Sequence, residues 1–270
     1  MIPDIELRLN DERTIMLAER IKLERKLIPL ISPQQEVLTG PFKGMRYTNT
    51  ALVGSALIPK VLGSYELELH GWMEYVCGGG GEFVPCGQID QSFVPYVQYT
   101  EVINIGSGEG YYAVGLAMRM PKTKVYAFEA NADVSRACRE MAASNGVSHK
   151  VVTNGACSIE LLNGIEITQK GFVLCDCEGC ELDILRPDMV EALLRCDLLV
   201  ELHDFVDERI SSVIKRRFKD SHAIESVKST NRNPMYYPQI AALSAFEREV
   251  ALAEYRPCEM EWVFMQALPQ

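Results

Sequence analysis

The sequence predicts an α/β fold in which a mainly helical N-terminal extension precedes a seven-stranded, mostly parallel sheet. From residue 100 onward, short apolar runs alternate with stretches whose apolar residues recur at helical spacing, as in β-α-β units with right-handed crossovers. The last run, Met260 to Met265, alternates polar and apolar residues, which predicts a final antiparallel strand. Strands are expected at residues 101–105, 124–129, 149–153, 171–176, 197–202, 222–228 and 260–267.

The extension covers residues 1–97, and the sheet-containing domain covers residues 98–270. Residues 1–30 are expected to be helical, because apolar residues recur among many charges, and to pack on the core or on another subunit. The run Gly78–Gly81 is expected to be a loop or hinge. A lid, a substrate-binding region and a homo-oligomer interface are all open as roles for the extension.

Composition narrows the class of protein. The chain has 270 residues, 47% of them hydrophobic, which is enough for a sizeable core. A net charge of −10 and a pI near 5.0 argue against a nucleic-acid partner. No apolar run approaches the ~20 residues that span a bilayer, and Asp4 and Glu6 interrupt any signal peptide, so we expect no membrane association and a cytoplasmic location. Nine scattered cysteines, an odd number, predict reduced thiols.

A glycine-rich turn, Gly-Ser-Gly-Glu-Gly at residues 106–110, follows the first predicted strand and precedes a helix. Glycines allow positive φ and close approach to a ligand, and the start of a helix offers unpaired N–H groups. A dinucleotide fingerprint would require a third glycine at position 111, which is Tyr111, so a nicotinamide oxidoreductase is only a weak alternative. Glu129 ends the second predicted strand, where a carboxylate can accept both ribose hydroxyls of an adenosine.

The apolar strand, Asn104 and the glycine turn together resemble motif I of class I S-adenosylmethionine-dependent methyltransferases. The resemblance implies a Rossmann-like seven-stranded methyltransferase sheet over residues 98–270, with S-adenosyl-L-methionine as the cofactor. Tyr111 either lines the methionine end of that site or packs in the core. The resemblance places Ala156 near the adenine. The expected cofactor-binding residues are Asn104, Gly106, Ser107, Gly108, Gly110, Tyr111, Glu129, Ala130, Ala156 and Asp176.

A second motif, Asp176-x-Glu178-Gly179-x-Glu181, resembles the signature of FkbM-type methyltransferases, which mostly methylate hydroxyl groups on sugars and other natural products. The resemblance covers residues 100–205 and implies methyl transfer to a hydroxyl of a small natural-product-like or sugar-like acceptor. Motif I departs from the family, whose members commonly read Gly-Ala-Asn-x-Gly. N-methylation of a small metabolite and a non-catalytic methyltransferase-fold binding protein are the alternatives.

Two side chains are the candidate catalytic residues. His203 follows a predicted strand whose end lies at the same sheet edge as Asp176. A hydroxyl acceptor must lose a proton, so we expect His203 to take it and Asp176 to orient the substrate. The competing interpretation is a structural histidine bonded to the backbone. His222 is expected to be structural.

A metal is not favoured at this edge. Hard oxygen ligands suit Mg²⁺, but carboxylates at strand ends are more often solvated or directed at a cofactor. Zinc is not expected, because Cys177 and Cys180 have ligand spacing without a second pair. These thiols are expected to fill the core, with Cys175 pointing opposite to Asp176. The possible metal ligands are Asp176, Glu178, Glu201, His203 and Asp204.

Overall fold

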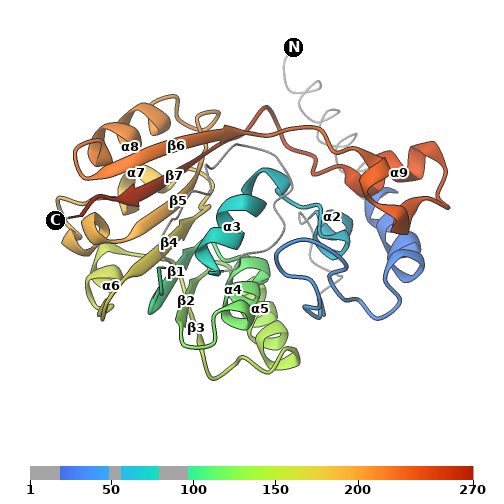
Figure 1. Cartoon of the computed structure of the whole chain (residues 1–270), viewed down its shortest axis with the longest axis horizontal. Helices are drawn as coiled ribbons and strands as arrows, with labels where there is room; N and C mark the ends of the chain where they lie inside the picture. The colour runs from blue at the N-terminus through green and yellow to red at the C-terminus, as the bar shows by residue number, and fades with distance from the viewer. Residues whose placement is uncertain (1–18, 49–55, 79–96, 270) are drawn as a thin grey trace, which may run out of the picture.

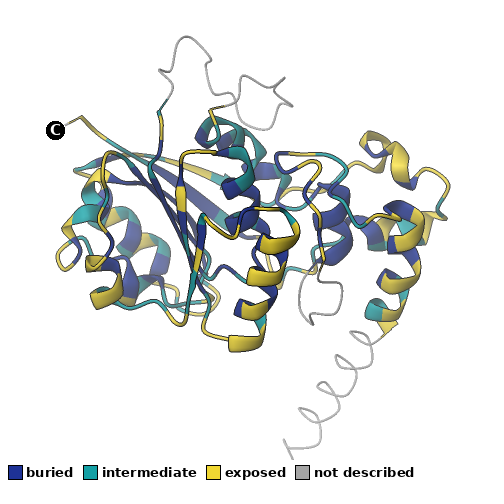
Figure 2. Cartoon of the chain, turned by 90° about the horizontal axis from the view of Figure 1, so that it is seen from below, coloured by how far each residue is buried: buried dark blue, intermediate teal, exposed yellow. Residues whose placement is uncertain are grey.

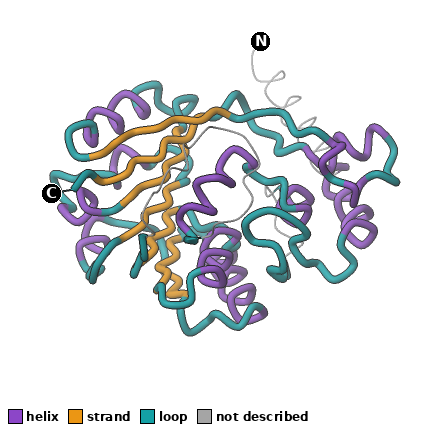
Figure 3. The backbone as a smooth tube through the Cα atoms, in the orientation of Figure 1, coloured by secondary structure: helices purple, strands orange, loops and turns teal. Residues whose placement is uncertain are grey.

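The computed structural model describes residues 19–48, 56–78 and 97–269. Its centre is a seven-stranded sheet with the order β3-β2-β1-β4-β5-β7-β6 (Figures 1 and 3). Strands β1 to β5 are parallel, and β7 runs antiparallel to both β5 and β6. This order confirms the predicted Rossmann-like methyltransferase sheet. The strands are β1 (Glu101–Ile105), β2 (Lys124–Phe128), β3 (Val151–Asn154), β4 (Gly171–Cys175), β5 (Asp197–Leu202), β6 (His222–Lys228) and β7 (Glu261–Ala267).

Helices cover both faces of the sheet, with α3, α4 and α5 on one face and α6, α7 and α8 on the other (Figure 1). Alternate residues of a strand enter opposite layers: Val102 joins the first hydrophobic cluster and Ile103 the second. Figure 2 shows the central strands buried between the two helical layers, and β1, β4 and β5 are buried at every position. The helices are α3 (His70–Val76), α4 (Tyr111–Arg119), α5 (Ala132–Ser144), α6 (Ile159–Asn163), α7 (Glu181–Ile184) and α8 (Ile210–Phe218).

The described part of the N-terminal extension packs directly on the sheet domain. It contains a helix over residues 19–31, then α2 (Leu57–Leu62), η1 (Leu67–Leu69) and α3. Phe42 lies against Gly115 of α4, where an added Cβ would be 2.4 Å from the ring. Trp72 stacks on Phe264 of β7 with centroids 5.5 Å apart. The two segments therefore share one hydrophobic cluster. Residues 1–18 of the predicted first helix and 79–81 of the predicted glycine loop lie outside the described residues.

The connection between β6 and β7 crosses to the N-terminal segment (Figure 1). It carries η3 (Pro234–Tyr236), η4 (Pro238–Ile240) and α9 (Ala245–Leu252), which packs on α2. A further short helix, η2 (Glu191–Arg195), precedes β5. Arg232 of this connection pairs with Glu68 at 2.6 Å, and both side chains are buried. Among the residues described, no helix is both long and apolar enough to cross a membrane.

Candidate active site

A cavity of about 760 Å³ lies at the carboxyl ends of the parallel strands. Its wall includes Gly106 after β1, Glu129 after β2, Asp176 after β4 and His203 after β5. Open α/β sheets bind ligands at this edge, where the chain order reverses between adjacent strands, here β1 and β4. The N-terminal extension and the β6–β7 connection complete the wall with Ala56, Lys60, Tyr65, Glu254, Tyr255 and Arg256.

The glycine turn fits a ligand held against the backbone. Gly106 has φ +74°, and a Cβ there would lie 1.6 Å from the carbonyl oxygen of Asp176, so the turn touches the end of β4 directly. Gly108 has φ +53°, and a Cβ there would meet nothing within 4 Å. Gly108 lines the cavity, so its missing side chain leaves room for a ligand beside the main chain.

Glu129 is fixed beside this turn. Its Oε2 accepts a hydrogen bond from the Gly108 N–H at 3.1 Å, and its Oε1 accepts one from the Asn131 N–H at 2.8 Å. The carboxylate therefore lies at the tip of β2 and lines the cavity. In this place it can accept the two vicinal hydroxyls of a ribose.

The other expected cofactor residues divide into two groups. Ala130 and Ala156 line the cavity, whereas Asn104, Ser107 and Gly110 do not. The side chains of Asn104 and Ser107 are buried, and their polar atoms have no hydrogen-bond partner among the described residues. Buried polar groups are usually satisfied, but these two side chains lie outside the cavity wall, so the cavity does not account for their unpaired atoms.

Tyr111 belongs to an aromatic cluster instead of the cavity wall. Its ring packs edge-on against Phe42 at 5.2 Å and Tyr65 at 5.4 Å between centroids, and it is buried. Of the two interpretations of this aromatic, packing in the core is what the structure shows. Tyr65 is the aromatic that reaches the cavity from this cluster.

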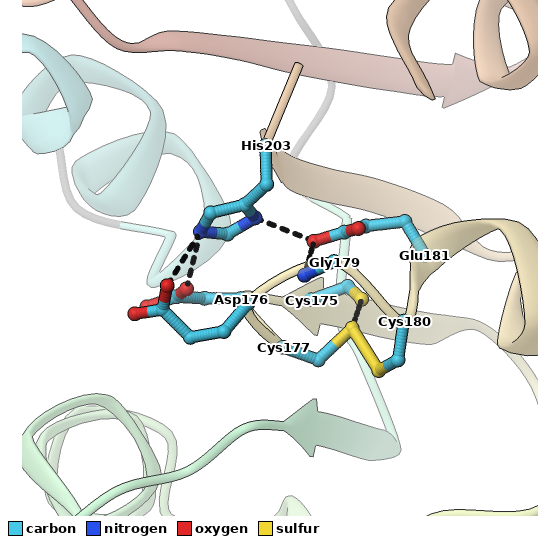
Figure 4. The surroundings of a disulfide bond; sticks show 8 residues. Cys175, Asp176, Cys177, Gly179, Cys180, Glu181 and His203 are labelled. Carbon is cyan, nitrogen blue, oxygen red and sulfur yellow. Dashed lines mark hydrogen bonds and ion pairs between the residues drawn. A yellow bond between two sulfur atoms is a disulfide. The ribbon is translucent and has the colours of Figure 1, made fainter. Parts of the chain in front are cut away.

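His203 is surrounded by three carboxylates (Figure 4). Its Nδ1 lies 2.5 Å from Oε1 of Glu181. Its Nε2 lies 3.5 Å from an oxygen of Asp176 and 3.5 Å from an oxygen of Glu178. His203 is 2% exposed and lines the cavity, so the ring is fixed through Nδ1 and presents Nε2 to the ligand space. The expected pairing of His203 with Asp176 at one edge is thus present in the geometry.

The carboxylates control the protonation of this imidazole. Burial lowers the pKa of His203, but the hydrogen bond to Glu181 and the charges of Asp176, Glu181 and Glu178 outweigh it, so the pKa is raised above its usual value. The neutral form, which can accept a proton, becomes predominant only above that raised pKa. His203 is therefore a stronger base than a solvated imidazole.

A second carboxylate group, Glu66, Asp176 and Glu201, shares Asp176 with the first. Oxygens of Glu66, Asp176 and Glu201 lie within 4.8 Å of one another. Burial, followed by the charge of Glu66, raises the pKa of Asp176, and burial with the charge of Asp176 raises that of Glu201. Arg256 supplies compensating charge, with Nη1 2.6 Å from Glu201 and Nη2 2.9 Å from Glu66. The group is therefore acidic but partly neutralised.

Two sets of side chains have ligand atoms close enough to share one cation. They are Asp176, Glu178 and His203, and Glu66, Asp176 and Glu201. Asp204, the other metal candidate, accepts a hydrogen bond from the Ser211 N–H instead. We assign no metal to either set, because the Glu178 side chain is 79% exposed and acidic groups at strand ends commonly occur without an ion.

The cysteine cluster differs from the prediction. Cys177 and Cys180 form a disulfide, where reduced thiols filling the core were expected. These residues lie on either side of a tight turn with Cα atoms 5.5 Å apart, which suits a disulfide. The odd number of cysteines in the whole chain, on which the prediction of reduced thiols rested, gives no information about such a local pair. Both half-cystines line the cavity. Cys175 is buried in β4 as expected.

Several wall residues were missed from the sequence. Lys60 and Glu109 form a buried ion pair at 2.6 Å, and Tyr47 also donates a hydrogen bond to Glu109. Glu109 lies inside the glycine turn, yet its spacing gives no sign of a partner 49 residues earlier. Arg256 likewise has no motif around it. His222 is structural as predicted, because its Nε2 lies 2.9 Å from the carbonyl oxygen of Cys196.

No protein-family model and no curated protein matches this sequence. Among solved structures, a putative O-methyltransferase from Klebsiella pneumoniae is similar, with a TM-score of 0.42 and 14% identity over 63% of this chain and 74% of that one. The O-methyltransferase TomG from Streptomyces achromogenes, involved in tomaymycin synthesis, has a TM-score of 0.41 and 14% identity over 63% and 74%. The precorrin-6y C5,15-methyltransferase from Geobacter metallireducens has a TM-score of 0.44 and 14% identity over 62% of this chain and 79% of that one.

Proposed function

We propose that this protein is an S-adenosylmethionine-dependent methyltransferase that methylates a hydroxyl of a small, natural-product-like or sugar-like acceptor. The observation that carries the proposal is the pairing of two features in one cavity. A glycine turn with a carboxylate at the next strand tip, Gly108 with Glu129, lies on one side. A buried, carboxylate-backed histidine, His203, lies on the other.

The first feature suits the cofactor. Gly106 and Gly108 would hold the methionine part of S-adenosylmethionine against the main chain, and Glu129 would accept the ribose hydroxyls. Ala130 and Ala156 lie on the same wall, where an adenine needs apolar contact. When bound, the cofactor supplies a sulfonium methyl whose carbon–sulfur bond breaks, leaving its electron pair on sulfur as the acceptor oxygen bonds to the methyl carbon.

The second feature suits the acceptor. His203 presents Nε2 to the cavity and would take the hydroxyl proton as the acceptor oxygen becomes nucleophilic. Asp176 lies at the end of β4 between the glycine turn and His203, so it would orient the acceptor between them. Methyl transfer depends mainly on such positioning, since effective molarities of oriented groups are large.

A protonated amine is the second candidate acceptor. The cavity wall carries Asp176, Glu178 and Glu201 near His203, and these carboxylates favour a cation. The same histidine would then remove a proton from the ammonium before nitrogen attacks. An acceptor panel containing matched alcohols and amines separates the two candidates.

The test is formation of S-adenosylhomocysteine from S-adenosylmethionine with that panel. We expect turnover with a subset of hydroxyl compounds and a 10²–10⁴-fold loss in His203→Ala, the usual contribution of a general base. The control is His149→Ala, which changes a histidine outside the cavity wall. Turnover that is unaffected by His203→Ala would contradict the assigned base, and binding without any turnover would favour a non-catalytic methyltransferase-fold protein.

A further inference from the structure

The carboxylate of Glu181 is buried, and no lysine or arginine of the described residues forms an ion pair with it. Glu181 is 0% exposed, and its ion-pair partner among the described residues is the His203 ring. Oε1 also accepts a long hydrogen bond, 3.3 Å, from the Gly179 N–H, while Oε2 has no hydrogen-bond partner in the described ranges. Burying a carboxylate without full compensation destabilises a fold by several kcal/mol. Stability therefore does not account for this side chain, and its one strong contact is the imidazole.

The chain fixes Glu181 at this place. The preceding turn contains Glu178 at φ +54° and Gly179 at φ +106°, and the Cys177–Cys180 disulfide closes it. A Cβ on Gly179 would lie 2.7 Å from a methyl of Val206, so the turn packs tightly on the loop that follows His203. Figure 4 shows Glu181 reaching from the start of α7 to the far side of the ring from Asp176.

We propose that Glu181 is a positioning residue: by accepting the Nδ1–H of His203, it holds the imidazole in the tautomer and orientation that leave the Nε2 lone pair facing the acceptor. The kinetic part of this inference rests on the proposed methyl transfer. The structural part, the tautomer, does not.

The two nitrogens of the ring have different environments that support this assignment. Nδ1 lies 2.5 Å from Oε1 of Glu181, close enough to donate a hydrogen bond to the carboxylate. Nε2 lies 3.5 Å from both Asp176 and Glu178, which is beyond the usual hydrogen-bond range, so neither carboxylate binds this nitrogen closely. A carboxylate behind a catalytic imidazole fixes the tautomer and stabilises the imidazolium that forms, and its loss in hydrolytic triads costs about 10⁴-fold in turnover.

The first test observes the wild-type ring directly. Two-bond ¹H–¹⁵N correlation spectra of the ¹⁵N-histidine-labelled protein resolve its four histidines, and His203→Ala identifies the signal. We expect neutral His203 to carry its proton on Nδ1 and to titrate above a free imidazole. A neutral ring protonated on Nε2 would overturn the proposal, because Nδ1 would then have no proton to donate to Glu181.

The second test compares Glu181→Gln with Glu178→Gln, which removes a charge on the Nε2 side of the same ring. Glu181→Gln is expected to lower the His203 pKa, because its hydrogen bond to the ring helps to raise that pKa, and to move the acidic limb of kcat/KM to lower pH. It should lower kcat by roughly 10²–10⁴-fold with little change in KM for S-adenosylmethionine. Glu178→Gln should leave the tautomer unchanged. An unchanged pKa and tautomer in Glu181→Gln would overturn the proposal.

A double variant separates positioning from a general structural role. Because Glu181 acts through His203, Glu181→Gln should cause no further loss of turnover when His203 is already alanine. Equal losses in both backgrounds would contradict the proposal. Absence of turnover in the wild-type protein would remove the methyl-transfer proposal, while the tautomer and pKa of His203 would still decide the role of Glu181.

Discussion

Arg256 donates a hydrogen bond from Nη1 to Oε1 of Glu201 at 2.6 Å and thereby ties the β6–β7 connection to the end of β5. The same guanidinium binds Glu66 of the N-terminal extension at 2.9 Å and Glu254 at 2.9 Å. One cation thus joins three segments that are distant in sequence. The fixed fork of arginine suits this arrangement, which a lysine could not reproduce.

Replacing Arg256 by methionine should strongly destabilise the fold. Glu66, Glu201 and Glu254 are each at most 8% exposed at the side chain and would lose their shared cation. We expect the free energy of unfolding, measured in urea, to fall by about 3–5 kcal/mol. The control Arg209→Met removes a cation that is 71% exposed and should cost no more than about 1 kcal/mol. Equal losses of unfolding free energy in the two variants would show that the buried ion pairs of Arg256 stabilise the fold no more than an exposed ion pair does.

The glycines at positions 106 and 108 should respond differently to alanine. Gly106→Ala drives a methyl into the Asp176 carbonyl, so unfolding free energy should fall by about 3 kcal/mol or more. Gly108→Ala adds a methyl in open space and should cost only the ~1–2 kcal/mol of a left-handed backbone. It should nevertheless weaken S-adenosylmethionine binding, because that space faces the cavity. Thermal unfolding measures the change in stability, and calorimetric titration measures the affinity for S-adenosylmethionine. An unchanged affinity in Gly108→Ala would argue against a ligand at this turn.

Glu109 should make the protein sensitive to acid. Burial raises the pKa of its carboxyl, but the charge and hydrogen bond of Lys60 and the hydrogen bond from Tyr47 lower it to about 2. Since the folded pKa is depressed, the stabilisation is complete above the unfolded pKa and is lost as pH falls from about 4.5 to about 2. The loss is on the order of 3 kcal/mol. In Lys60→Met the protein should be less stable at neutral pH and lose less on acidification. Parallel pH profiles of the two proteins would contradict this.

Reduction of the Cys177–Cys180 disulfide should affect the site more than the fold. The bond closes only the short turn that carries Glu178, so its loop-closure contribution to stability is small. The turn also positions Glu181 beside His203, so turnover should fall in dithiothreitol and in Cys177→Ser. Alkylation of the unreduced protein followed by peptide mass spectrometry should find these two cysteines unlabelled. The control Cys258→Ser changes an exposed free thiol and should have no effect. Labelling of Cys177 in the unreduced protein would contradict the disulfide.

The sheet was predictable because its signals are local. The apolar runs of β1 and β4, for example, are buried at every position, and the glycine turn marks where β1 gives way to α4. Strand ends then place their polar residues at one edge, which is why Glu129, Asp176 and His203 were found from the sequence. The antiparallel β7 was likewise visible in its alternating pattern.

The rest of the site depends on packing between distant segments. Lys60 and Arg256 lie in segments whose sequence shows no motif, and they reach the cavity only because α2 and the β6–β7 connection pack together beside it. From its position in the sequence, Tyr111 could have lined the cofactor site or packed in the core. Its contacts with Phe42 and Tyr65 show that it packs in the core. The disulfide was missed because cysteine counting ignores the local turn.

The central claim is tested most directly by calorimetric titration with S-adenosylmethionine, S-adenosylhomocysteine and NAD, which requires no knowledge of the acceptor. We expect both sulfur compounds to bind and NAD not to bind. Glu129→Ala should weaken binding at least about 10-fold, which is 1.4 kcal/mol, whereas Glu140→Ala, an exposed carboxylate on α5, should change nothing. Failure of both sulfur compounds to bind, or preferential binding of NAD, would contradict the assignment of the glycine turn and Glu129 as an S-adenosylmethionine site.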